Sequence, residues 1–190
     1  MYISVGVDCG PANIFNELGL RTVSLPFDWV VTYKGVAHII NNEFSNYLPL
    51  DTCDVMNNDC AVRFHHNTFP SDFETLSRRI DRFKQILETS TEKITFLRKG
   101  HGEHHHSEYP LLGDDIDDAI QLDTVLRTKY PHLDYEIHVI LICDSCFTTN
   151  TKKYNEPDTV KIHNLARPYT KDLNVTNPPY FNELCRRLFV

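Results

Sequence analysis

Apolar runs rich in β-branched residues alternate along this chain with segments whose apolar residues recur at helical spacing. The runs predict strands at residues 2–7, 21–25, 60–66, 93–98, 135–143 and 160–163. The segments predict helices at residues 11–19, 32–44, 71–87, 114–130 and from about 180 onward. Strands that alternate with helices are typical of a largely parallel sheet. We therefore expect an α/β fold in which residues 1–190 form a single three-layer domain, with a mainly parallel central sheet and helices on both faces.

Turn and capping residues refine several of these boundaries. The small Gly6 and its β-branched neighbours suit a central position in the sheet for the strand at 2–7. Thr32 is expected to cap the second helix. Ser71 and Glu74 have the spacing of a capping box, which predicts that the third helix begins at Ser71.

The composition is that of an ordinary globular protein of one domain, with 190 residues, of which 41% are hydrophobic and 24% charged. A net charge of −7 argues against nonspecific binding to nucleic acid, which requires clustered Lys and Arg. The longest apolar run, 139–142, is far shorter than the roughly 20 residues of a membrane span. The first residues lack the pattern of a secretory signal, so we expect a cytoplasmic location in which the six cysteines stay thiols.

Cys9 is the strongest candidate for chemistry in the chain. It follows a predicted strand and precedes a predicted helix, so its side chain is expected at the carboxyl edge of the sheet, where open α/β sheets bind ligands. The positive end of the helix favours a thiolate, whereas the neighbouring Asp8 opposes one. The alternative is a small buried cysteine at a tight junction between strand and helix.

Two histidines and two aspartates are candidates for the groups that would assist this thiol. His65 and His66 close a predicted strand, and only one of the two can point to the side of Cys9. Asp28 lies between two aromatic residues and could orient the histidine, as could Asp72. Asp72 also has a structural explanation, since an acidic residue in the first turn of a helix stabilises the helix dipole. The histidines could equally be ordinary surface residues.

Three further clusters have weaker interpretations. The run His101–His106 is dense in metal-ligating residues but reads as a loop, and Cys143 with Cys146 lacks a partner pair for a structural zinc, so we expect no metal ion and no cofactor. Arg78, Arg79 and Arg82 could bind an anion, or they could form a solvated helix face.

Beyond these residues, the chain resembles the papain-like cysteine peptidase domain found in bacteria and in large DNA viruses. The resemblance covers about residues 1–145 and rests on the blocks 4–9, 11–12, 19–21, Ser24, 26–29, 64–66, 78–80, 82–83 and 96–98. It implies a nucleophile at Cys9, a base at His66 with His65 beside it, and an acidic partner at Asp28. Asp8 stands where the family commonly has Asn. If the protein is viral, the expected place is the host cytoplasm or the virion.

The function predicted from the sequence is therefore hydrolysis or transfer of an acyl or amide group, with a protein or peptide as substrate. In this interpretation Trp29 and the three arginines would contact the substrate. One alternative is a non-catalytic structural or interaction protein, for example one associated with a virion. The other is a transferase that acts on nucleotide-linked sugars or phosphates, with Arg78, Arg79 and Arg82 binding the anion.

Overall fold

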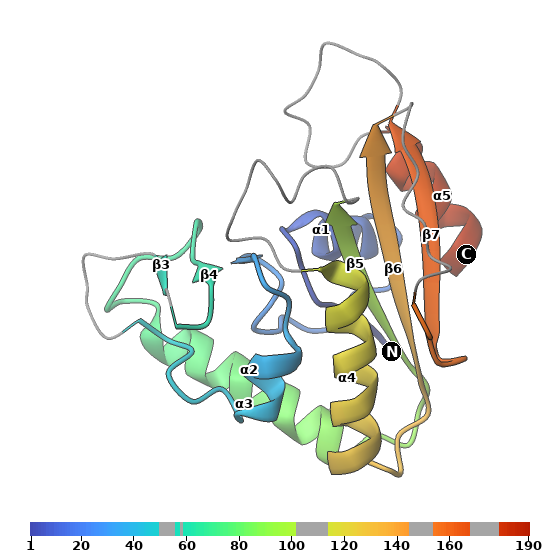
Figure 1. The fold of residues 1–190 in the computed structure, drawn as a ribbon. Coiled ribbons are helices and arrows are strands. Elements are labelled where there is room, and N and C mark those ends of the chain that lie inside the picture. Colours follow the sequence, from blue (N-terminus) through green and yellow to red (C-terminus); the bar gives the residue numbers. More distant parts are fainter. Residues whose placement is uncertain (50–55, 58, 102–113, 145–153, 168–178) are drawn as a thin grey trace.

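The computed structural model of the 190-residue chain describes residues 1–49, 56–57, 59–101, 114–144, 154–167 and 179–190 (Figure 1). The strands are β1 (Tyr2–Ser4), β2 (Val31–Thr32), β3 (Met56–Asn57), β4 (Val62–Arg63), β5 (Ile94–His101), β6 (Tyr135–Asp144) and β7 (Val160–Arg167). The helices are α1 (Gly10–Glu17), α2 (Ala37–Asn41), α3 (Phe73–Thr89), α4 (Asp115–Lys129) and α5 (Pro179–Phe189). None of the helices in these ranges is long and apolar enough to cross a membrane.

The main sheet has four strands in the order β1-β5-β6-β7, and all of its pairings are parallel. This confirms the predicted parallel sheet. The expectation of a central first strand is wrong, because β1 lies at the edge of this sheet. Backbone hydrogen bonds nevertheless continue past β1, from Val5 N to Leu97 O and from Val7 N to Lys99 O. Thr32 N donates to Val7 O on the side away from β5. The apolar Val5 and Val7 are therefore buried although β1 is an edge strand.

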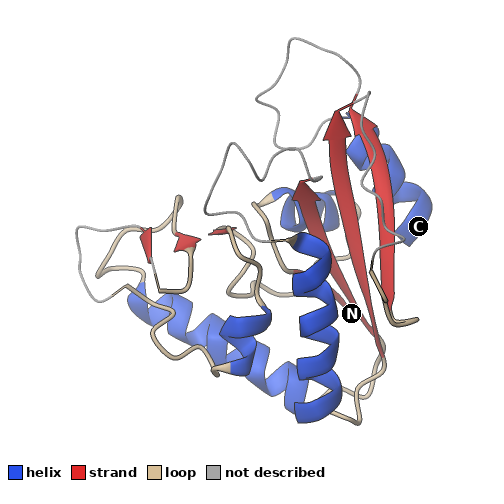
Figure 2. Ribbon diagram, viewed as in Figure 1, coloured by secondary structure: helices blue, strands red, loops and turns tan. Residues whose placement is uncertain are grey.

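Helices cover both faces of the sheet, as predicted (Figure 2). On one face α1 and α5 pack against β5 and β6 through a small apolar cluster that includes Phe15, Leu97, Ile140 and Phe181. On the other face α4 packs on the sheet, and α2 and α3 extend the larger core. The helical spacing in α3 has its predicted effect, because its buried residues are Leu76, Ile80, Phe83 and Leu87.

The segment between α1 and α3 differs most from the prediction. Residues 21–25 form no strand, because Leu25 N donates to the Asp28 carboxylate and the chain turns at 26–29. The strand expected at 60–66 is reduced to β4, which pairs antiparallel with both β2 and β3. Thr32 belongs to β2 and does not cap the following helix, which is short.

At the starts of the two long helices, α3 and α4, one prediction is wrong and one is correct. Asp72, and not Ser71, is the N-cap residue of α3, and its carboxylate accepts from Thr68 N and Asn67 Nδ2 in the preceding loop. The predicted capping box is therefore wrong, since the side chains before α3 bond to the loop. At α4 the acidic start has the expected role, because Asp114 accepts from the amides of Ile116 and Asp117.

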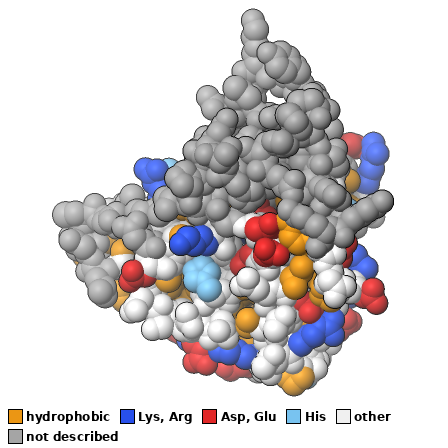
Figure 3. Space-filling view, in the orientation of Figure 1, with side chains coloured by type: hydrophobic (Ala, Val, Ile, Leu, Met, Phe, Trp, Pro, Cys, Tyr) orange, Lys and Arg blue, Asp and Glu red, His pale blue; other side chains and the backbone are white. Residues whose placement is uncertain are grey.

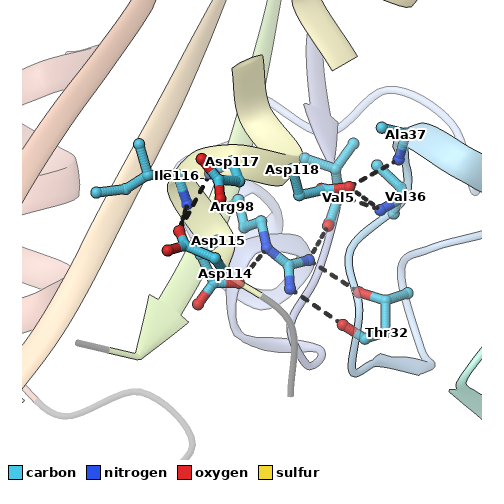
Figure 4. Close-up of polar contacts among 10 residues, drawn as sticks. All are labelled: Val5, Thr32, Val36, Ala37, Arg98, Asp114, Asp115, Ile116, Asp117 and Asp118. Carbon is cyan, nitrogen blue, oxygen red and sulfur yellow. Dashed lines mark hydrogen bonds and ion pairs between the residues drawn. The ribbon is translucent and has the colours of Figure 1, made fainter. Parts of the chain in front are cut away.

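A buried polar network joins the main sheet to the small sheet and to α4 (Figure 4). Arg98 in β5 contacts the Asp115 carboxylate through Nε at 2.6 Å, Val5 O and Thr32 Oγ1 through Nη1, and Thr32 O through Nη2. We call these four residues the Arg98 network. Nearby, the buried Asp118 of α4 accepts from the amides of Val36 and Ala37 and so caps α2 from outside. Together these contacts hold the segment that leads to Cys9.

Candidate active site

Cys9 lies where the sequence predicted it, between the carboxyl end of β1 and the first residue of α1. It is the N-cap residue of α1 and is partly exposed, whereas Cys60 and Cys185 are buried. The thiol is therefore not sealed in apolar packing. The parallel strands β5, β6 and β7 end toward the same side of the molecule as α1 (Figure 1).

An ion pair lies directly beside this thiol. The ammonium group of Lys99, in β5, is 2.5 Å from Oδ2 of Asp8, and the Oδ1 atom of Asp8 accepts from Gly10 N at 2.8 Å. Lys99 is buried, and its ammonium also lies 5.8 Å from the centre of the Phe181 ring in α5. The charges of both signs are thus fixed next to the first turn of α1.

The surroundings of Cys9 raise the pKa of its thiol. Burial contributes most, and the negative charge of Asp8 acts in the same direction. The backbone N–H of Cys9, the charge of Lys99 and the Asn13 side chain lower the pKa, in that order. The effect of Asp8 has the direction expected from the sequence. In the resting protein the thiol form is favoured at neutral pH, so attack by Cys9 requires a base.

The first turn of α1 offers few backbone amides to a negatively charged oxygen. Gly10 N already donates to Asp8, and Pro11 has no N–H. The side chain of Asn13 lies one helical turn from Cys9, close enough to lower the pKa of its thiol. Asn13 and Lys99 were not among the predicted site residues. The spacing of four residues between Cys9 and Asn13 is a signal that could have indicated Asn13, whereas nothing local links Lys99 to Cys9.

His65 and His66 follow β4, and both are exposed. The His66 ring lies edge-on to Trp29, with 6.1 Å between the ring centres. Burial and the nearby Arg63 lower the pKa of His65. Within the described ranges, neither imidazole hydrogen bonds to Cys9. His66 therefore lies against Trp29 in the structure.

Asp28 is buried and is bound by groups other than a histidine. Its Oδ2 atom accepts from Arg21 Nε and Nη2, at 3.1 and 2.7 Å, and from Leu25 N at 2.8 Å. Burial raises the pKa of its carboxyl group, although the Leu25 amide and Arg21 oppose this rise. Arg21 in turn lies over the Trp29 ring at 5.5 Å. Asp28 thus reaches His66 indirectly, through Arg21 and Trp29.

The three arginines of α3 differ in what they contact. Arg82 Nη1 donates to Ser24 O at 2.7 Å, and Arg78 donates to Thr75 Oγ1 at 3.3 Å. Arg79 lies close enough to lower the pKa of both Asp28 and Asp72. In the view of Figure 3, acidic and basic side chains are interspersed over the described surface. Arg79 and Arg82 therefore support the segment around Asp28, whereas the hydrogen bond of Arg78 stays within α3.

Two predicted clusters fall almost entirely outside the described residues. Of His101–His106, only the backbone of His101 at the end of β5 is described, and of 143–146 only the backbone of Cys143 and Asp144 in β6. Among the residues with described side chains, no group of three or more His, Cys, Asp or Glu could hold a metal ion.

A pair of histidines on the main sheet was not predicted. His138 of β6 and His163 of β7 stack with an angle of 9° between their rings, and His138 Nδ1 is 3.1 Å from His163 Nε2. Burial lowers the pKa of both rings, that of His163 to about 4, and the Phe189 ring of α5 packs on His138. A positive charge on His138 therefore opposes a second one on His163.

This pair predicts that the protein loses stability in mild acid. A histidine with a pKa near 6.5 in the unfolded chain binds a proton there first, so stability is full above about pH 6.5 and falls as the pH decreases toward the pKa of the folded state. We expect the free energy of unfolding to fall by about 1–2 kcal/mol between pH 7 and pH 4.5 because of His163, after allowance for its partial exposure. Urea unfolding at several pH values measures this loss.

The variant His163→Gln should lose much of this pH dependence. His132→Gln, a change at an exposed histidine, is the control and should leave the slope unchanged. Equal slopes in the wild type and in His163→Gln would contradict the role of the pair.

The N-terminal part of the chain is similar to known proteins. Residues 1–67 and 51–145 match the model of the family described as "Putative papain-like cysteine peptidase". An uncharacterized protein of Acanthamoeba polyphaga mimivirus is 31% identical over 137 residues. This alignment covers 52% of the chain and 60% of the viral protein. No solved structure matches the chain.

Proposed function

Because the chain belongs to the family described as "Putative papain-like cysteine peptidase", we propose that it is a cysteine hydrolase in which Cys9 is the nucleophile. The observation that carries the proposal is the position of this thiol, partly exposed at the N-cap of α1 after the carboxyl end of β1. Ligands of open α/β sheets bind at this edge, and a helix N-terminus favours a thiolate. The substrate is an amide or ester, most simply a protein or peptide.

The proposed reaction has two halves. The sulfur of Cys9 attacks the acyl carbon while its proton passes to the imidazole of His66, and the C–N or C–O bond then breaks as the leaving group takes that proton. A water molecule, deprotonated by His66, next attacks the thioester, releases the acid and restores the thiol. The raised pKa of Cys9 is consistent with this general-base step, since the resting thiol must lose its proton.

Asn13 is the proposed donor to the negatively charged oxygen of the tetrahedral intermediate. The usual donors at a helix start are backbone amides, but Gly10 N is bonded to Asp8 and Pro11 has none. The Asn13 amide, one helical turn from Cys9 and close enough to lower the pKa of its thiol, is proposed to serve together with the backbone N–H of Cys9 itself.

Asp28 is proposed to act on His66 through intermediate residues. Its carboxylate fixes Arg21, Arg21 lies over Trp29, and the Trp29 ring lies edge-on to His66. A charge held over an aromatic face restrains both groups. Asp28 is in this proposal a positioning residue. His65, whose ring centre lies 6.4 Å from that of His66, is the alternative base.

The test is hydrolysis of a panel of activated esters and fluorogenic peptides, together with labelling by a cysteine-directed peptide probe. We expect Cys9→Ser to lower kcat/KM by at least about 10³-fold and His66→Asn by roughly 10²–10⁴-fold. Asp28→Asn should lower kcat more than it changes KM. Cys60→Ser, at a buried thiol, is the matched control and should keep full activity.

Wild-type turnover by Cys9→Ser would contradict the assignment of the nucleophile. The raised pKa of Cys9 also favours one alternative, a non-catalytic interaction protein that keeps the fold. In that case iodoacetamide at neutral pH would label Cys9 as slowly as the buried Cys185, and no substrate in the panel would be cleaved.

A further inference from the structure

The ion pair between Asp8 and Lys99 is built from an unusually buried lysine. Lys99 is 4% exposed although it lies only two residues before the end of β5. Removing an ammonium group from water costs several kcal/mol, so a chain keeps such a lysine only where a partner offsets that cost. Asp8 supplies this partner at 2.5 Å. An apolar residue would fill the same place at lower cost, so the retained charge calls for an explanation.

Both charges are held in fixed positions. Asp8 has one carboxylate oxygen on Lys99 and the other on Gly10 N, so it cannot turn away from the start of α1. Lys99 is anchored by the backbone pairing of β5 with β6 and by the Phe181 ring. Cys9 follows Asp8 in the chain, and the charges of both Asp8 and Lys99 act on its thiol.

The two charges act on the sulfur in opposite directions. The negative charge of Asp8 opposes a thiolate, and the positive charge of Lys99 favours one. The pKa of Cys9 reflects this opposition, since Asp8 raises it and Lys99 lowers it while burial raises it further. A change in either partner must therefore alter the reactivity of the thiol.

We propose that Asp8 and Lys99 are positioning residues that together set how readily Cys9 ionises. Lys99 keeps a positive charge beside the sulfur, and Asp8 both fixes this lysine and limits its effect. The inference deepens the proposed function and rests on it for the role of Cys9 as nucleophile. The reactivity of the thiol, however, is measurable without any substrate.

The experiment is alkylation of Cys9 by iodoacetamide from about pH 6 to about pH 11, followed by mass spectrometry of the peptide that contains Cys9. Asp8→Asn should move the midpoint of the profile down by roughly 0.5–1 unit, and Lys99→Met should move it up by a similar amount. At pH 7 the rates should change about threefold in each direction, because a more abundant thiolate is also a weaker nucleophile. Lys99→Arg, which keeps the charge, should stay close to the wild type.

The chain offers a matched control at the other end of β5. Lys93 and Glu136 form an ion pair of 2.9 Å, and Lys93→Met and Glu136→Gln should leave the profile of Cys9 unchanged. Cys185 is an internal control, because burial raises its pKa to about 12 and it should stay unlabelled.

Midpoints that stay fixed, or that move in the same direction in Asp8→Asn and Lys99→Met while the melting temperature is retained, would overturn the proposal. If Lys99→Met does not fold, the result for Asp8→Asn is sufficient. An unchanged or raised midpoint in Asp8→Asn would also overturn the proposal. Shifted midpoints in a protein that hydrolyses no substrate would refute the proposed function and leave this inference intact.

Discussion

Replacing Arg98 by methionine is expected to lower the free energy of unfolding by about 3–5 kcal/mol. The guanidinium is 1% exposed and binds Asp115, Val5 and Thr32 at once (Figure 4). Methionine fills a similar volume but offers no donor, so the buried Asp115 carboxylate would lose its ion pair, and Val5 O and Thr32 O would each lose one hydrogen bond. Urea unfolding followed by circular dichroism measures the loss.

Two further variants show whether the loss comes from the Arg98 network. Arg127→Met removes an arginine whose side chain is 55% exposed from an ion pair with the buried Asp123. Because Asp123 keeps hydrogen bonds from Tyr135 Oη and Thr159 Oγ1, the change should cost less than about 1 kcal/mol. The double variant Arg98→Met/Asp115→Asn should be destabilised by less than the sum of the two single changes, because both charges of their ion pair are then removed together. A cost for Arg98→Met no larger than that for Arg127→Met would contradict the prediction.

Replacing Gly6 by alanine is expected to lower the free energy of unfolding by about 3 kcal/mol or more. The new methyl group would strain the backbone and would also collide with residues of the Arg98 network. Gly6 has a φ of +92°, a conformation that glycine tolerates far better than alanine. A β-carbon there would lie 2.0 Å from Thr32 Oγ1 and 2.9 Å from Arg98 Nη1. Thermal and urea unfolding test the change, and iodoacetamide labelling shows whether Cys9 moves with it.

Gly19 provides the control for this second change. It also has a positive φ, of +68°, but a β-carbon there would meet no atom within 4 Å. Gly19→Ala should therefore lower the free energy of unfolding only by the cost of placing alanine at a positive φ, roughly 1 kcal/mol. Equal losses in the two variants would mean that the contact with Thr32 contributes nothing.

Several features of the fold were predictable because their signals are local. The helical stripe that runs from Leu76 to Leu87 and the apolar runs at 93–98 and 135–143 correspond to α3, β5 and β6. Their alternation indicated a parallel sheet with helices on both faces, which the structure confirms. The position of Cys9 at the start of α1 was predictable for the same reason, since the apolar run ends at Val7 and the helical spacing begins near Pro11.

Two of the wrong predictions concern places where a side chain forms hydrogen bonds with the backbone of a nearby loop or turn. Asp28 binds Arg21 and Leu25 N, and this turn replaces the strand expected before it. Asp72 bonds to the loop at Thr68 and so displaces the expected capping box. In both cases a short polar side chain outweighs a weak local preference.

The amino-acid sequence alone determined the α/β class and the thiol at the strand-to-helix junction, because both follow from the spacing of neighbouring residues. Only the tertiary structure decided which charges surround that thiol. Lys99 is 90 positions from Cys9 in the chain, and Asp28 faces Arg21 when a histidine was expected. The packing of β5 against β1 brings Asp8 and Lys99 together, and pairings of this kind depend on the whole fold.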